Sequence, residues 1–200
     1  MPELKNETPT DSELREYFLE HFSSTVEGEM YAPPNRGVPE LTAGCNRLIK
    51  KAGESIFASL QRLNQLERTD PFWRGTNRRP TVYKLIEFCD VVLKENAGDV
   101  LALWTQLALE VVWGGNNGLF DLEQLRQLRA AGKLEAEELI CAELYIEFNC
   151  DCSTASTTAR LLRELGMSDE AKPVLATGRR SADGDIVNWC ESVLANLSKV

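Results

Sequence analysis

The sequence contains a single histidine, His21, and it lacks the short motifs that mark common catalytic sites. Histidine is the side chain that most often moves protons near neutral pH, but His21 lies between Phe18 and Phe22 on an apolar helical face, where a structural role is expected. No Gly-x-Ser-x-Gly, Gly-x-x-x-x-Gly-Lys-Ser/Thr or His-Glu-x-x-His occurs. The sequence therefore predicts a protein that is not an enzyme and that holds no metal or other cofactor.

Basic residues and long apolar runs are also scarce. Lys and Arg number 22 against 31 Asp and Glu, which gives a net charge of −9. A protein that binds nucleic acid or an anionic membrane needs a basic face, so we expect neither partner. No apolar run approaches the ~18 residues of a membrane-spanning helix, and the first residues carry no signal-peptide pattern. We therefore predict a cytoplasmic protein with a basic partner.

The six cysteines are too few for a secreted disulfide scaffold of 200 residues, so we expect reduced thiols. The most metal-like feature is Cys150-Asp151-Cys152, with Cys141 nearby on the preceding helix. Because no second Cys/His pair follows at a matching spacing, we favour a tight turn over 149–153 that binds no zinc. A redox-labile pair formed by Cys150 and Cys152 is the alternative.

Apolar residues recur every three or four positions in nearly every segment, and no segment alternates as a strand does. We expect a single all-α domain over residues 1–200, with N-terminal helices in 1–68, a basic loop at 69–80 and helix hairpins in 81–200. About 8–9 helices should cover more than half of the chain. Their predicted limits are 10–28, 41–68, 81–96, 99–113, 121–131, 134–148, 153–165, 168–176 and 185–197.

The last six predicted helices alternate at a nearly constant interval. Those that begin near residues 99, 134 and 168 are 35 and 34 residues apart, and their partners near 119, 153 and 185 are 34 and 32 apart. Residues 84–104, and the turn 162–171 with Gly166 and Ala171, resemble the tetratricopeptide repeat family. The resemblance covers about residues 81–200 and implies stacked helix hairpins in a right-handed array. An irregular helical bundle is the alternative.

Charge is unevenly distributed along the chain. Residues 41–80 carry eight basic and three acidic side chains, whereas residues 81–152 carry five basic and 13 acidic ones. This asymmetry predicts either an internal electrostatic contact or a local anion site. An acidic stretch is expected to form mostly one solvated side of a helix, and it would suit a basic partner if it lines a concave surface. Its members are Glu135, Glu137, Glu138, Glu143, Glu147 and Asp151.

Two tryptophans fit apolar helical faces and are expected in the core, namely Trp104 and Trp189. Trp113 ends a helix beside the turn 114–118, so we expect it to be a partly exposed anchor for a partner. The Gly-rich turn itself joins two helices and lacks the Lys or Ser/Thr of a phosphate loop. The predicted partner-binding residues are Trp113, Glu135, Glu138, Glu143 and Glu147.

Arginines and an aromatic side chain cluster in the loop that follows the second helix. Arginine beside an aromatic ring can bind phosphate, carboxylate or an unstacked base, but these arginines can equally pair with acids of the protein itself. We favour the internal pairing. The residues of the alternative anion site are Arg68, Trp73, Arg74, Arg78, Arg79 and Lys84.

The sequence as a whole predicts a non-enzymatic protein–protein interaction module, such as an adaptor, a chaperone or a toxin-neutralising immunity-type protein. Its partner is expected to be a basic protein or peptide. The alternative is an anion- or nucleotide-binding regulatory domain, or an enzyme, that uses the arginine-rich loop 68–84.

Overall fold

The computed structural model describes residues 10, 12–13, 39–69, 82–113, 122–150 and 154–199. Within these ranges the chain forms eight helices and no strand, which confirms the predicted all-α class. At the start of the predicted first helix, Thr10 and Glu13 cap each other: the Glu13 N–H donates to Thr10 Oγ1 (3.3 Å) and the Thr10 N–H donates to Glu13 Oε2 (2.7 Å). The helices are α2 (Pro39–Thr69), α3 (Val82–Glu95), α4 (Val100–Trp113), α5 (Leu122–Ala130), α6 (Ala136–Cys150), α7 (Ala155–Glu164), α8 (Ser168–Gly178) and α9 (Gly184–Leu197).

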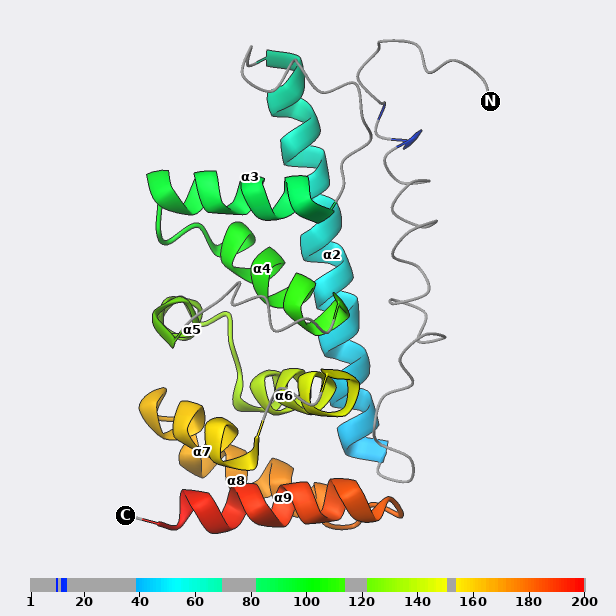
Figure 1. Ribbon diagram of the computed structural model, residues 1–200, viewed down its shortest axis with the longest axis vertical. Coiled ribbons are helices and arrows are strands. Elements are labelled where there is room, and N and C mark those ends of the chain that lie inside the picture. Colours follow the sequence, from blue (N-terminus) through cyan, green and yellow to red (C-terminus); the bar gives the residue numbers. More distant parts are fainter. Residues whose placement is uncertain are drawn as a thin grey trace.

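Helix α2 is the spine of the molecule. It follows the long axis, and the other helices are stacked beside it in succession, from α3 toward one end to α8 and α9 at the other (Figure 1). It contacts α3, α4, α6 and α8. Its predicted apolar face is confirmed by the burial of eight side chains, each 6% exposed or less: Leu41, Cys45, Leu48, Ile49, Ala52, Ile56, Leu60 and Leu63.

Small side chains let α2 and α4 approach closely, and this is the most extensive helix contact of the described chain. Ala52 and Ala102 are fully buried on the two helices. Ser59 and Thr105 are fully buried too, and their hydroxyls lie 2.7 Å apart. Thr105 Oγ1 also donates to the carbonyl of Ser55 (3.0 Å). The buried hydroxyls therefore have partners, as a stable interior requires.

The helices beyond α4 are packed in succession, and α5 contacts α4. Helices α4, α6 and α8 contact each other in order, and α7 packs against α9. Glycines with positive φ, Gly132 (65°) and Gly166 (67°), end α5 and α7. At both turns the N–H of the next residue donates to a carbonyl five positions earlier, so the two hairpin links share one geometry. Pro173 lies inside α8 without ending it, because its ring is exposed and water can reach the carbonyl it leaves free.

Candidate functional site

The first turn of α6 is bound to α2 by two ion pairs. Lys51 Nζ lies 2.6 Å from Glu138 Oε1 and also donates to the carbonyl of Lys133 (2.8 Å). Arg47, one turn earlier on α2, pairs with Glu137. The second oxygen of Glu138 accepts the N–H of Glu135 (2.9 Å), which caps the start of α6. The carboxylates at this end of α6 therefore bind groups of the protein itself, namely two side chains of α2 and a backbone N–H.

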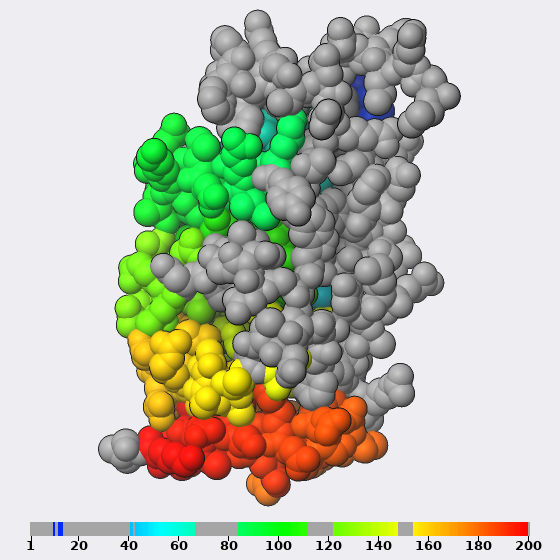
Figure 2. Space-filling model, viewed as in Figure 1, coloured from blue at the N-terminus to red at the C-terminus, as the bar shows by residue number. Residues whose placement is uncertain are grey.

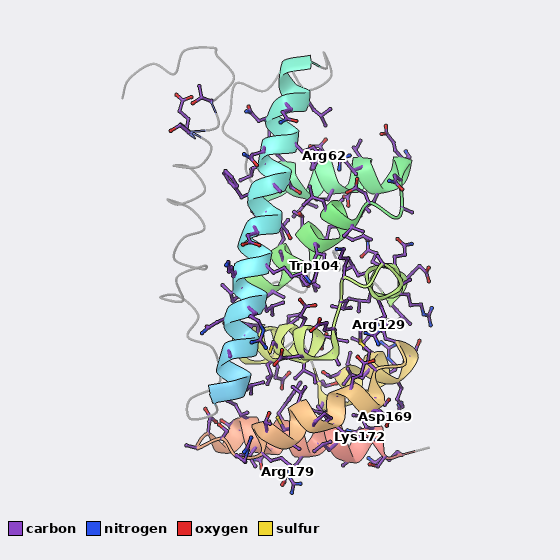
Figure 3. All side chains as sticks on the ribbon, turned by 180° about the vertical axis from the view of Figure 1, so that it is seen from behind. Arg62, Trp104, Arg129, Asp169, Lys172 and Arg179 are labelled. Carbon is purple, nitrogen blue, oxygen red and sulfur yellow. The ribbon has the colours of Figure 1, made fainter. Side chains whose placement is uncertain are left out.

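Trp104 completes this contact from α4. Its ring centroid lies 3.8 Å from Lys51 Nζ, and its indole N–H donates to the same Lys133 carbonyl (3.0 Å). The ring is 3% exposed, so the prediction of a core tryptophan is confirmed. Figure 3 shows Trp104 against α2, with Arg62 further along the same helix. Because the ring and the carboxylate hold one ammonium group, the lysine is fixed between three helices.

A second charged contact joins α2 to the start of α4. Arg62 Nη1 lies 2.6 Å from Asp99 Oδ2, and Asp99 Oδ1 accepts the N–H of Ala102 (3.0 Å) as the helix cap. Burial by itself would raise the pKa of Asp99, but the hydrogen bonds from Arg62 and Ala102 outweigh it and lower that pKa. We call these contacts of Arg47, Lys51 and Arg62 with Glu137, Glu138 and Asp99 the α2 seam.

The α2 seam explains part of the uneven distribution of charge along the sequence. Three basic side chains of the positive segment meet three acids of the negative segment, so an internal electrostatic contact exists among the described residues. Of the seam residues, only Glu138 was singled out from the sequence as a site residue, and it was predicted to bind a partner rather than to form an internal ion pair. A signal for the basic residues was present, because Arg47 and Lys51 stand one helical turn apart on a helix with a clear apolar face.

The prediction of one solvated acidic side on α6 is wrong. Glu143 is only 4% exposed, and its Oε2 accepts a hydrogen bond from Thr158 Oγ1 of α7 (3.2 Å). Glu138 is held in the α2 seam, Glu147 is partly buried, and Glu135 alone of the four is exposed. The reason is that α6 packs against α2, α4, α7 and α8, so it has no continuous solvent-facing side.

Several predicted site residues lie outside the described part of the chain. They include Trp73, Arg74, Arg78 and Arg79 of the loop, the turn 114–118, His21 and Cys152, and the side chains of Arg68, Trp113 and Cys150. Of the alternative anion site, the structure places the side chain of Lys84, which is partly buried on α3. The anion site therefore stays a prediction.

Four cysteines are buried as free thiols. Burial raises the pKa of Cys89 to about 12 and that of Cys190 to about 12. A hydrogen bond with the neighbouring Cys45, together with burial, raises the pKa of Cys141 well above the usual range. The thiols of Cys89, Cys141 and Cys190 therefore stay protonated at neutral pH, and all four buried cysteines pack as small apolar residues. Among the described residues, no three His, Cys, Asp or Glu side chains are grouped as metal ligands are.

Acidic side chains are exposed elsewhere, on the outer face of α3. Glu87, Asp90 and Glu95 are exposed there with one basic residue, Lys94. Asp90 Oδ1 accepts a hydrogen bond from the buried Gln106 of α4 (2.8 Å), whereas neither Glu87 nor Glu95 has an ion-pair partner among the described residues. Helix α3 lies at the surface of the molecule, at the upper left of Figure 2. We call Glu87, Asp90 and Glu95 the α3 acidic face.

No helix in the described ranges is long and apolar enough to cross a lipid bilayer. Comparisons of the chain with protein-family models, with curated proteins and with solved structures found no match.

Proposed function

We propose that this protein is a non-catalytic interaction module that binds a basic protein or peptide through the α3 acidic face. The observation that carries the proposal is the different use of carboxylates by two helices of the same acidic segment. Those of α6 lie inside the protein or pair with α2, whereas Glu87 and Glu95 of α3 point their charge at solvent. Unpaired surface carboxylates attract a positively charged partner over a distance of about 8 Å at physiological ionic strength.

Apolar side chains on α3 add to this face. Ile86 and Val91 are partly exposed and stand beside Glu87 and Asp90 along the helix. A partner with alternating apolar and basic side chains would cover both kinds of group at once. Contact surfaces gain most of their binding energy from such partly apolar centres, while the charges set specificity and association rate.

The spacing of the helices supports the proposal that α3 belongs to an array of repeated helix hairpins. Gly98, Gly132 and Gly166 follow α3, α5 and α7 at intervals of 34 residues. An array in which each hairpin contacts its neighbours presents long continuous surfaces, as interaction modules do. We therefore keep the tetratricopeptide-like array as part of the proposal.

The test is affinity capture with three full-length baits, followed by quantitative mass spectrometry. The baits are the wild-type protein, a Glu87→Lys/Glu95→Lys variant and a matched control, Asp169→Lys/Asp185→Lys, whose exposed acids lie on α8 and α9. The two variants have the same net charge, so a loss seen only with the α3 variant does not come from overall charge. Because Asp169 pairs with Lys172, circular dichroism first checks that the control is folded. We expect basic proteins retained by the wild type and by the control to fall about tenfold with the α3 variant.

Two results would contradict the proposal. If both variants lose the same proteins equally, retention reflects overall charge rather than the α3 acidic face. If Arg78→Glu/Arg79→Glu abolishes retention while the α3 variant keeps it, the binding surface is the arginine-rich loop and the partner is acidic.

A further inference from the structure

Two hydrogen bonds of the buried Gln106 join three successive helices. Gln106 lies on α4 and is 2% exposed. Its Nε2 donates to Asp90 Oδ1 of α3 (2.8 Å), and its Oε1 accepts a hydrogen bond from Gln124 Nε2 of α5 (2.9 Å). Helices α3, α4 and α5 follow one another along the long axis (Figure 1). Both ends of the buried amide are therefore bonded, and one of them holds a member of the α3 acidic face.

Gln106 occupies a position where an apolar side chain would be expected. Residues 102–111 of α4 are all buried, and most of them are apolar. An amide in such a place loses its hydrogen bonds to water, so it costs stability unless protein groups replace them. Asp90 and Gln124 supply the replacements. Because packing restricts the rotamers of Gln106, its amide is a fixed donor, and the carboxylate of the exposed Asp90 is held in one position.

The other two carboxylates of the α3 acidic face are not held in this way. Glu87 and Glu95 have neither a hydrogen bond nor an ion pair within the described ranges. Their side chains also have one more rotatable bond than that of Asp90. A partner must therefore order Glu87 and Glu95 when it binds, whereas Asp90 is ordered beforehand, which lowers the entropic cost of binding.

Asp90 keeps the capacity to bind a partner's cation. It forms no ion pair in the described part of the chain, although Lys94 follows one helical turn later. A carboxylate has about four acceptor positions, so both oxygens can still accept hydrogen bonds when Oδ1 is bonded to Gln106. The negative charge of Asp90 is thus fixed in place but not neutralised.

The surroundings of Asp90 favour one kind of cation. Ile86 and Leu93 stand one helical turn before and after it on α3, and both are partly exposed apolar residues. A guanidinium group is planar and weakly hydrated, and it donates two parallel hydrogen bonds to a carboxylate of matching orientation. An ammonium group is a strongly hydrated point charge, for which that orientation matters little. A fixed carboxylate between apolar side chains therefore discriminates in favour of arginine.

We propose that Asp90 is the anchor of the α3 acidic face, that Gln106 is its positioning residue, and that the group bound there is an arginine side chain of the basic partner. Glu87 and Glu95 add attraction that does not distinguish arginine from lysine. The inference rests on the proposed function, because it assigns the specificity of the same face.

Two short fluorescent peptides test the proposal by fluorescence anisotropy. Leucine alternates with arginine in one and with lysine in the other, so the two peptides have the same charge. We expect the full-length wild type to bind the arginine peptide about tenfold more tightly, since only the guanidinium group uses the orientation of Asp90. The quantity compared is the ratio of the two dissociation constants, because a loss of folded protein weakens both interactions and leaves that ratio unchanged.

Two variants remove the fixed orientation without changing the net charge. Gln106→Met replaces the amide by an apolar side chain of similar length, and Asp90→Glu lengthens the side chain that Gln106 holds. Each should lower the ratio to about twofold or less by weakening the arginine peptide, with little change for the lysine peptide. Because Asp90 is exposed, Asp90→Glu keeps the test valid if Gln106→Met does not fold.

The matched control is Gln127→Met, the same substitution on α5. Gln127 Oε1 has no hydrogen-bond partner among the described residues, so this variant should keep the ratio of the wild type. If the wild type binds both peptides equally, or if Gln106→Met and Asp90→Glu keep its ratio, the inference is wrong and the proposed function is unaffected. If neither peptide binds, or if Glu87→Lys/Glu95→Lys binds both as tightly as the wild type, the α3 acidic face is not the binding surface and both proposals fail.

Discussion

Helices α3 and α6 belong to the same acidic segment, yet they use their carboxylates in opposite ways. On α6, Glu137 and Glu138 pair with α2 and Glu143 is buried against Thr158. On α3, Glu87 and Glu95 are exposed. The difference comes from the neighbours: α6 packs against four helices, whereas α3 packs mainly against α4 and α2. A helix that packs against few neighbours leaves its carboxylates exposed, whatever the number of acids that it carries.

Charged side chains have two different roles in this protein. In the α2 seam, an ammonium group and a carboxylate are brought together by packing and add specificity to a contact that apolar side chains stabilise. On the α3 acidic face, Glu87 and Glu95 have no ion-pair partner among the described residues, so their charge is directed at solvent. The same residue type is therefore part of the scaffold on one helix and is proposed to be part of a binding surface on the other.

The largest difference is expected from reversing one charge on each helix. Glu143→Lys should lower the free energy of unfolding by about 3–5 kcal/mol, because it places a positive charge in a site that is 4% exposed. Glu87→Lys should change it by no more than about 0.5 kcal/mol, because the side chain is exposed. Urea unfolding followed by circular dichroism measures both. Equal decreases in the free energy of unfolding for the two variants would mean that Glu143 is not buried.

A smaller effect is expected for the ion pair of the α2 seam. A double-mutant cycle with Lys51→Ala and Glu138→Ala should give a coupling energy of about 1 kcal/mol, since the two groups are partly buried and 2.6 Å apart. The matched control is Lys50 with Glu54, an exposed pair one turn apart on the same helix, for which about 0.3 kcal/mol is expected. A coupling energy between Lys51 and Glu138 no larger than that of the control would mean that this ion pair does not stabilise the contact of α2 with α6.

The smallest effect concerns pH. The folded-state pKa of Asp99 is lowered, so the unfolded chain binds the proton more readily and stability rises with pH in this range. The contribution of Asp99 is complete above its unfolded pKa and is lost as the pH falls through its folded pKa. Asp99→Asn keeps the cap but removes this titration. Between about pH 5 and pH 3 the variant should therefore lose less stability than the wild type; identical slopes would contradict the assigned pKa shift.

Much of the scaffold could be predicted from the sequence. The spacing of Leu41, Cys45 and Ile56 gave the buried face of α2, and the predicted limits of most helices agree with the structure to within about two residues. Trp104 and Trp189 were correctly expected in the core, since each is 6% exposed or less.

The candidate site was predicted less well, for a physical reason. Helical periodicity identifies a face, but it does not identify what packs against that face. Glu143 and Glu87 each lie among apolar residues of a helix in the sequence. Only the tertiary structure shows that Glu143 accepts a hydrogen bond from Thr158 and that Glu87 is exposed to solvent. The α2 seam required the same knowledge, because its members are up to 90 positions apart.

Chemical labelling of carboxylates measures how far α6 shields its acids and α3 exposes them. Native protein is treated with a carbodiimide and glycinamide, and modification of each acid is followed over time by peptide mass spectrometry. We expect Glu87 and Glu95 to be modified at least about tenfold faster than Glu143, with Glu138 between them because of its pairing with Lys51. Modification of Glu143 as fast as that of Glu87 would mean that α6 does not bury this carboxylate.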